Sequence, residues 1–163
     1  MTEVIVDTNV AVVANQQNGS VVTSCIDACM IFIATTPGKH IVLIDDADEI
    51  RQEYAKALQE SRPYGLGALF LQHVYQHQYN PSRVRRVALA LDADGEYADF
   101  PKDPALANFD PSDRKFAALA RSTGVPVTNA TDSDWIDDIV ALNAQGIAVD
   151  FLCGQNKTSW FTP

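Results

Sequence analysis

The chain has 163 residues, of which 47% are hydrophobic and 20% are charged. This length predicts one compact domain over residues 1–163. Twelve basic side chains against 21 acidic ones give a formal net charge of −9, and most of the acids are aspartates. Overall charge therefore cannot hold nucleic acid or an anionic membrane, because phosphate contacts need clustered lysine and arginine. Any binding to nucleic acid has to be local or metal-assisted.

Two further patterns limit where the chain can work. Its apolar stretches fall far short of the ~18–20 uncharged residues of a membrane span, and Glu3 and Asp7 interrupt the apolar N-terminus, so neither a span nor a signal peptide is expected. Cys25, Cys29 and Cys153 form an odd set without C-x-x-C spacing. That spacing argues against a disulfide framework and a thiolate zinc site, and a reduced cytoplasm is the expected compartment.

The predicted elements alternate along the chain between strands and helices. Short apolar runs predict strands, at residues 3–7, 40–45, 125–131 and 147–153. Longer runs with apolar residues at helical spacing predict helices, at residues 21–35, 47–59, 64–79, 110–123 and 134–145. Residues 85–91 suit a strand or a helix end, and residues 92–111 a long loop of the kind that is often functional. The alternation predicts a three-layer α/β/α fold with a central parallel sheet.

Acidic side chains follow the predicted strands at their carboxyl ends. Asp7 closes the first strand, and Asp132 and Asp134 follow a later one. Asp113 and Glu53 lie in early turns of helices that flank the same edge of the sheet. Ligands of open parallel sheets gather at this edge, where repulsion between carboxylates raises their pKa values unless a cation compensates. Mg²⁺ and Mn²⁺ prefer such oxygen ligands, so the pattern predicts a metal-dependent phosphoryl-transfer site.

Four segments resemble the motifs of the PIN domain family, in the family's order and over nearly the whole chain. They read V-D-T-N-V, I-R-Q-E-Y-A-K-A-L, D-P-S-D-R-K-F-A-A-L-A and T-N-A-T-D-S-D-W. PIN domains are α/β/α metal-dependent ribonucleases that include many bacterial toxins of toxin–antitoxin pairs and some RNA-processing or DNA-directed enzymes. The resemblance therefore implies a PIN-like fold and an endoribonuclease that uses Mg²⁺ or Mn²⁺. Since many family members are toxins, one expected role is that of the toxin in a toxin–antitoxin or defence system.

The resemblance also implies a role for particular side chains. The implied catalytic and metal-binding carboxylates are those of Asp7, Glu53, Asp113 and Asp132, with Asp134 as an auxiliary metal ligand. Asn9 would be a polar residue that supports the ligands. Glu49 lies on the same helix face as Glu53 and stays an alternative, although Glu53 is preferred because an aromatic residue follows it. Trp135 stands where the family commonly has Phe or Leu.

The implied reaction is hydrolysis of a phosphodiester by an in-line water that a carboxylate-bound metal activates. Arg114 and Lys115 adjoin Asp113 and are candidate phosphate contacts. The expected partners are a nucleic-acid substrate, with RNA favoured, an antitoxin or other protein, and a second copy of the chain in a homodimer. No membrane partner is expected.

Two other classes of function stay open at this point. A non-catalytic PIN-like scaffold that binds a partner protein would carry the same motifs without turnover. A receiver-like phosphoacceptor domain is suggested by the paired acids Asp45 and Asp46 and by Asp92 after a later apolar run. The last predicted strand lacks the lysine that a receiver needs after it, which argues against this second alternative.

Overall fold

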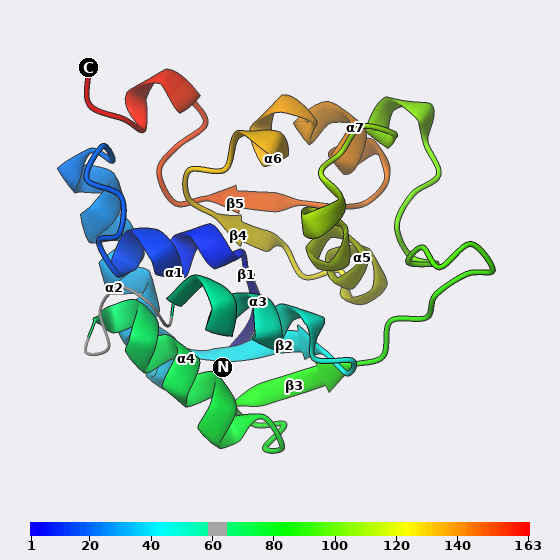
Figure 1. Ribbon diagram of the computed structural model, residues 1–163, viewed down its shortest axis with the longest axis horizontal. Helices are drawn as coiled ribbons and strands as arrows, with labels where there is room; N and C mark the ends of the chain where they lie inside the picture. Colours follow the sequence, from blue (N-terminus) through cyan, green and yellow to red (C-terminus); the bar gives the residue numbers. More distant parts are fainter. Residues whose placement is uncertain (59–64) are drawn as a thin grey trace.

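The computed structural model describes residues 1–58 and 65–163 (Figure 1). Its centre is one sheet of five strands, β1 (Thr2–Val6), β2 (His40–Asp45), β3 (Val84–Val87), β4 (Val127–Asn129) and β5 (Val149–Phe151). The strand order is β3-β2-β1-β4-β5, and every neighbouring pair is parallel. The prediction of an α/β fold with a parallel sheet is thus confirmed, and the first part of the segment 85–91 belongs to β3.

The inner strands are buried on both faces, which explains their continuous apolar sequences. Ile5 and Val6 of β1, Leu43 and Ile44 of β2, and Val127 of β4 are all completely inaccessible to solvent. The apolar run ends at an aspartate in both β1 and β2, because the strand there reaches the edge of the hydrophobic core. The extent of the hydrophobic core therefore determines where along each strand the aspartate stands.

Seven α-helices accompany the sheet in the described residues. They are α1 (Thr8–Ala14), α2 (Thr23–Lys39), α3 (Glu49–Leu58), α4 (Leu66–His77), α5 (Arg114–Thr123), α6 (Ser133–Asp137) and α7 (Ile139–Ala144). Helix α4 contacts α1, α2 and α3, and α2 and α3 also pack on β2, whereas α5 contacts β1, β2 and β4 and meets α3. Successive connections run first towards β3 and then back towards β5, so right-handed crossovers put the two groups on opposite faces. This is consistent with the predicted three-layer arrangement.

Helix boundaries differ from the prediction in places. The predicted ends at Gln59 and Tyr64 lie outside the described residues. Helix α2 was predicted to stop before Pro37 but runs to Lys39. Proline removes only one backbone donor in this last turn, and the guanidinium of Arg83 donates a hydrogen bond to the Pro37 carbonyl over 2.6 Å.

The segment predicted as one helix over residues 134–145 is two helices. Helix α6 ends at Asp137, and α7 begins at Ile139. Asp138, between them, has φ −102° and ψ 12°, outside the regular helical values. Helix α6 is therefore short, and Asp134 lies in its first turn, which directly follows the cap residue Asp132.

The expectation that the cysteines form no disulfide was wrong for one pair. Cys25 of α2 and Cys153, just beyond β5, are joined by a disulfide with their Cα atoms 4.9 Å apart. Cys29 is a free, buried thiol, and burial raises its pKa to about 12. The bonded pair is 128 residues apart in sequence, so the packing of the C-terminal segment on α2 decides the pairing.

Among the described residues, no helix has the length and apolar character needed to cross a membrane.

Candidate metal centre

The candidate centre lies where the direction of the chain connections reverses. Strands β1 and β4 are neighbours, but the chain leaves β1 towards β2 and leaves β4 towards β5. Crevices outside the carboxyl ends of strands at such a switch point are the usual ligand sites of open α/β sheets. Asp7 directly follows β1, and Asp132 follows β4 as the residue that caps α6. Asp113 ends a 3₁₀ turn that leads into α5.

Three carboxylates converge at this point. One oxygen from each of Asp7, Asp113 and Asp132 lies within 4.8 Å of the other two. Asp7 is 2% exposed and Asp113 is 5% exposed. A second group, Asp110, Asp113 and Asp134, meets the same criterion and shares Asp113 with the first. The structure thus brings together four of the five acids that the sequence motifs single out, in two groups that share Asp113.

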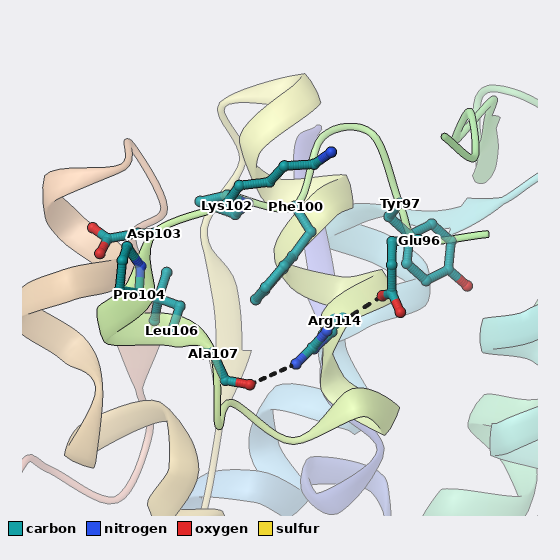
Figure 2. A pocket seen from close by; sticks show the side chains of 10 residues that line it. Glu96, Tyr97, Phe100, Lys102, Asp103, Pro104, Leu106, Ala107 and Arg114 are labelled. Atoms are coloured by element: carbon teal, nitrogen blue, oxygen red, sulfur yellow. Dashed lines mark hydrogen bonds and ion pairs between the residues drawn. The ribbon is translucent and has the colours of Figure 1, made fainter. Parts of the chain in front are cut away.

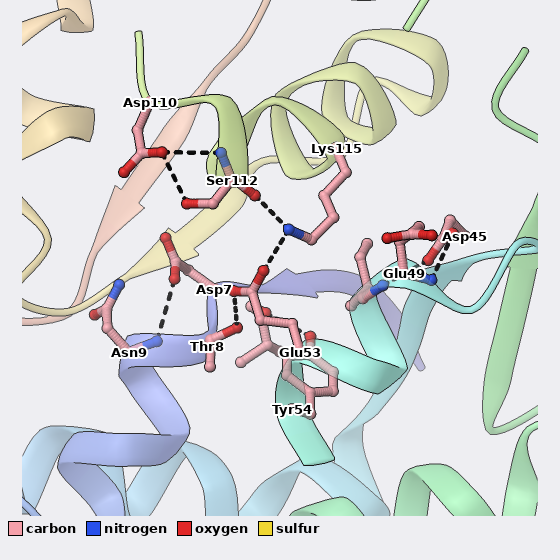
Figure 3. A network of polar contacts seen from close by, with 12 residues as sticks. Asp7, Thr8, Asn9, Asp45, Glu49, Glu53, Tyr54, Asp110, Ser112 and Lys115 are labelled. Carbon is pink, nitrogen blue, oxygen red and sulfur yellow. Dashed lines mark hydrogen bonds and ion pairs between the residues drawn. The ribbon is translucent and has the colours of Figure 1, made fainter. Parts of the chain in front are cut away.

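Asp7 is held by donors from two elements. Its Oδ1 accepts the backbone N–H of Asn9 over 3.1 Å, which caps the start of α1, as Figure 3 shows. Its Oδ2 accepts the indole N–H of Trp135 in α6. Burial raises the pKa of Asp7 to about 7, with a further contribution from the nearby charge of Asp132, while the two hydrogen bonds lower it.

Asp113 differs from its neighbours because its side chain does not cap a helix. The buried Oδ2 of Asp113 has no hydrogen-bond partner among the described residues. Burial, followed by the charges of Asp7 and Asp132, raises the pKa of Asp113 to about 10. The pKa of Asp134 is also raised, first by burial and then by Asp132. A divalent cation would relieve these costs together, so the donor set fits Mg²⁺ or Mn²⁺.

A pair of asparagines positions the loop that carries Asp132. Asn9 donates from its amide to Asn129 Oδ1 over 2.8 Å and accepts the backbone N–H groups of Ala130 and Thr131 over 2.9 and 3.0 Å. Asn129 is fully buried and donates to the Asp132 carbonyl over 3.0 Å. These bonds agree with the supporting role implied for Asn9. No role was predicted for Asn129, although it lies within the segment T-N-A-T-D-S-D-W.

Protein-family models, curated proteins and solved structures give no match to the chain. The function must therefore be inferred from the site itself, since one fold can carry many functions.

Glu53, the fifth predicted acid, has other partners. The Thr8 hydroxyl donates to its Oε1 over 2.5 Å, and its Oε2 forms an ion pair with the ammonium of Lys115 (Figure 3). Lys115 is 8% exposed and also donates to the Ser112 carbonyl. Glu49, the alternative to Glu53, is exposed and lacks these contacts in the structure. The pairing of Lys115 with Glu53 was not anticipated, because the sequence shows only that Lys115 follows Asp113 closely.

Asp45 is a buried acid of a different kind. It is 1% exposed, and its two oxygens accept the backbone N–H groups of Glu49 and Ile50 over 3.0 and 2.8 Å. These donors belong to the first turn of α3, whose positive dipole end favours a carboxylate. Asp45 is therefore a helix cap.

Arg114, the other predicted phosphate contact, binds to residues of the long loop 92–111 (Figure 2). Its guanidinium pairs with Glu96 over 3.3 Å, donates to the Ala107 carbonyl over 3.1 Å and lies 4.9 Å from the centre of the Phe100 ring. These groups line a cavity of about 260 Å³ between the loop and α5, together with Tyr97. Both candidate phosphate contacts are therefore engaged by groups of the protein itself.

Proposed function

We propose that the protein is a metal-dependent endonuclease with a PIN-like domain, and that it hydrolyses RNA phosphodiester bonds. The observation that carries this proposal is the cluster of Asp7, Asp113 and Asp132 at the switch point of the sheet. Two of these side chains are almost fully buried, and an oxygen of Asp113 has no partner among the described residues. Unpaired buried carboxylates are costly, and a cation that binds them removes the cost.

Asp7, Asp113 and Asp132 would hold Mg²⁺ or Mn²⁺, with Asp134 as the auxiliary ligand. When bound, the ion supplies a Lewis acid for phosphate oxygens and lowers the pKa of a water so that it can attack phosphorus. The protein's own groups orient the ligands: the Trp135 indole fixes one oxygen of Asp7, and Asn9 and Asn129 fix the loop before Asp132. This preorganisation is what a metal centre requires of the groups around its ligands.

The PIN-like assignment is supported by where the four motif acids stand along the fold. Asp7 follows β1, Glu53 lies in α3, Asp113 precedes α5 and Asp132 precedes α6. The order matches the order of the family's motifs, and the preference for RNA comes from that resemblance. The role of a toxin or defence nuclease, an antitoxin partner and a homodimer belong to the same proposal.

Two alternatives make different predictions. A non-catalytic scaffold shares the fold but has no turnover. A receiver-like phosphoacceptor is supported less well, because receivers have the strand order 2-1-3-4-5, whereas this sheet has the order 3-2-1-4-5. Asp45 is also committed to capping α3, and Asp92 accepts backbone N–H groups within an exposed turn.

Metal titration combined with a cleavage assay tests the proposal. We expect isothermal titration to detect Mn²⁺ binding and the loaded protein to cleave end-labelled RNA in preference to single-stranded DNA. Asp7→Asn should lower both binding and cleavage by about 10²-fold or more, because it removes a ligand charge. Asp150→Asn, which alters an exposed aspartate on β5, is the matched control and should change neither. Binding without cleavage would favour the scaffold, and absence of Mn²⁺ binding would refute the proposal.

A further inference from the structure

Lys115 is a buried cation within the acidic edge of the sheet. It is 8% exposed, and its ammonium contacts Glu53 Oε2 and the Ser112 carbonyl. The ammonium also lies 5.2 Å from the centre of the Phe116 ring. A lysine is almost never this buried unless it is paired, so its place depends on Glu53.

Glu53 is correspondingly occupied on both oxygens. Oε1 accepts the Thr8 hydroxyl over 2.5 Å, and Oε2 is paired with Lys115. Thr8, which binds Oε1, directly follows Asp7 in the chain, so the Glu53 carboxylate is held next to the start of α1, and its side chain is 27% exposed. Glu53 thus stands beside the Asp7–Asp113–Asp132 cluster while its charge is already balanced from within the protein.

We propose that the Lys115 ammonium is a built-in cation that takes the place of a second metal ion, so that the centre binds a single divalent ion. This inference rests on the proposed function. The ion would be held by Asp7, Asp113 and Asp132, and Glu53 would not be a ligand while Lys115 is paired with it. Lys115 is a positioning residue in this scheme, because it acts through Glu53.

The electrostatics favour an arrangement in which one divalent ion is bound by the aspartates and Glu53 is paired with Lys115. In two-metal sites the ions lie about 3.5–4 Å apart and share carboxylates between them. A second ion at Glu53 would have to displace the ammonium from Oε2, or lie next to a like charge. Removal of the ammonium would leave the Glu53 carboxylate without its cation, next to Thr8 and the Asp7 that precedes it, and a divalent ion could then take the place of the ammonium.

The number of Mn²⁺ ions bound per chain tests the inference without reference to activity. Isothermal titration and electron paramagnetic resonance of bound Mn²⁺ should give one ion for the natural protein and two for Lys115→Met. Lys115→Arg keeps a positive charge and should give one ion. Combining Lys115→Met with Glu53→Gln removes the second set of ligands and should return the number to one. Lys102→Met, which alters an exposed lysine paired with Asp92, is the matched control and should give one ion.

The outcomes separate this inference from the proposed function. Two ions in the natural protein, or one ion in a folded Lys115→Met variant, would overturn the role of Lys115 and leave the metal centre in place. No ion in the natural protein would overturn both. Glu53→Gln combined with Lys115→Met leaves no unpaired ammonium and should keep the affinity of the remaining ion close to that of the natural protein, whereas a loss of about tenfold or more would identify Glu53 as a ligand and refute the inference.

Discussion

The carboxyl edge of the sheet has two acidic regions, which we call the β2 side and the β1–β4 side. On the β2 side, Asp45 accepts two backbone N–H groups of α3, and Glu53 is paired with Lys115. On the β1–β4 side, Asp7, Asp113 and Asp132 lie together with no ion pair among the described residues. The two sides are adjacent and similarly acidic, but only the second lacks an internal cation.

This difference shows that the number of carboxylates does not identify a metal centre. A buried carboxylate whose partners belong to the protein contributes to stability, as a helix cap or as half of an ion pair. Where burial and neighbouring carboxylates outweigh the available donors, as at Asp7 and Asp113, the pKa is raised and the charged form destabilises the folded state until a proton or a cation binds. The candidate metal centre is therefore the part of the acidic edge where, among the described residues, no lysine or arginine pairs with the carboxylates.

The largest contrast should come from making the same substitution on each side. Asp113→Asn should lower Mn²⁺ affinity by about 10²-fold or more and raise the metal-free stability by about 1–3 kcal/mol, because a poorly solvated acid is removed. Asp45→Asn should leave Mn²⁺ affinity unchanged and lower stability by about 1–2 kcal/mol, because an amide nitrogen cannot accept a backbone N–H. Calorimetry of unfolding and of Mn²⁺ binding measures both.

Equal losses of stability in Asp113→Asn and Asp45→Asn would contradict the contrast. They would mean that the protein balances the charge of Asp113 as well as it balances that of Asp45.

Stability of the metal-free protein should depend on pH through the β1–β4 side. The pKa is about 7 for Asp7 and about 10 for Asp113 in the folded state, against 3.8 for an unperturbed aspartate. Between these values the folded state binds more protons than the unfolded state. Its stability is therefore greatest near the unfolded pKa and falls as the pH rises through the folded ones. We expect a loss of roughly 2–4 kcal/mol from each of the two carboxyls between pH 5 and 8.

Urea unfolding in EDTA across this pH range gives the slope. Saturating Mn²⁺ should flatten it, because the metal replaces the protons, and Asp113→Asn should reduce it in EDTA. A slope that is the same in the Asp113→Asn variant would show that this carboxyl does not titrate as the burial of its side chain implies.

Local sequence predicted much of the fold, because the inner strands are apolar runs that end where the core ends. The aspartates after β1 and β4 could be expected at one edge of the sheet for the same reason, since parallel strands share that edge. Helix α1 was not predicted as a helix: its short run Thr8–Ala14 is apolar at nearly every position, so it shows no helical periodicity. The spacing of apolar residues likewise gave no indication of the break between α6 and α7 at Asp138.

The contacts that distinguish the two acidic sides could not be predicted. The pairing of Glu53 with Lys115 depends on how α3 and α5 are rotated against each other, and the Cys25–Cys153 disulfide depends on the docking of the C-terminal segment. Sequence spacing specifies which residues share a helix face, but it does not specify which residue of another helix that face meets. The candidate acids were therefore predictable as a set, whereas their division was not.

The smallest expected effect tests the donor that distinguishes Asp7 from Asp113. Trp135 is fully buried, donates its indole N–H to Asp7 and packs edge-on against Phe109 with ring centres 5.1 Å apart. Trp135→Phe keeps an aromatic ring but removes the N–H. The pKa of Asp7 should rise, since the bond favours the charged form, and Mn²⁺ affinity should fall by about 10-fold at neutral pH.

Trp160→Phe is the matched control, because Trp160 is 1% exposed and donates its indole N–H over 2.9 Å to the Gly154 carbonyl. Both substitutions lose one hydrogen bond and some apolar volume, so they should lower stability by similar amounts, but Trp160→Phe should leave Mn²⁺ affinity unchanged. The effect at Trp135 should also shrink as the pH rises above the pKa of Asp7, because deprotonated Asp7 no longer requires the donor to stay charged. An affinity loss that is independent of pH would instead mean that the indole orients the carboxylate without altering its charge.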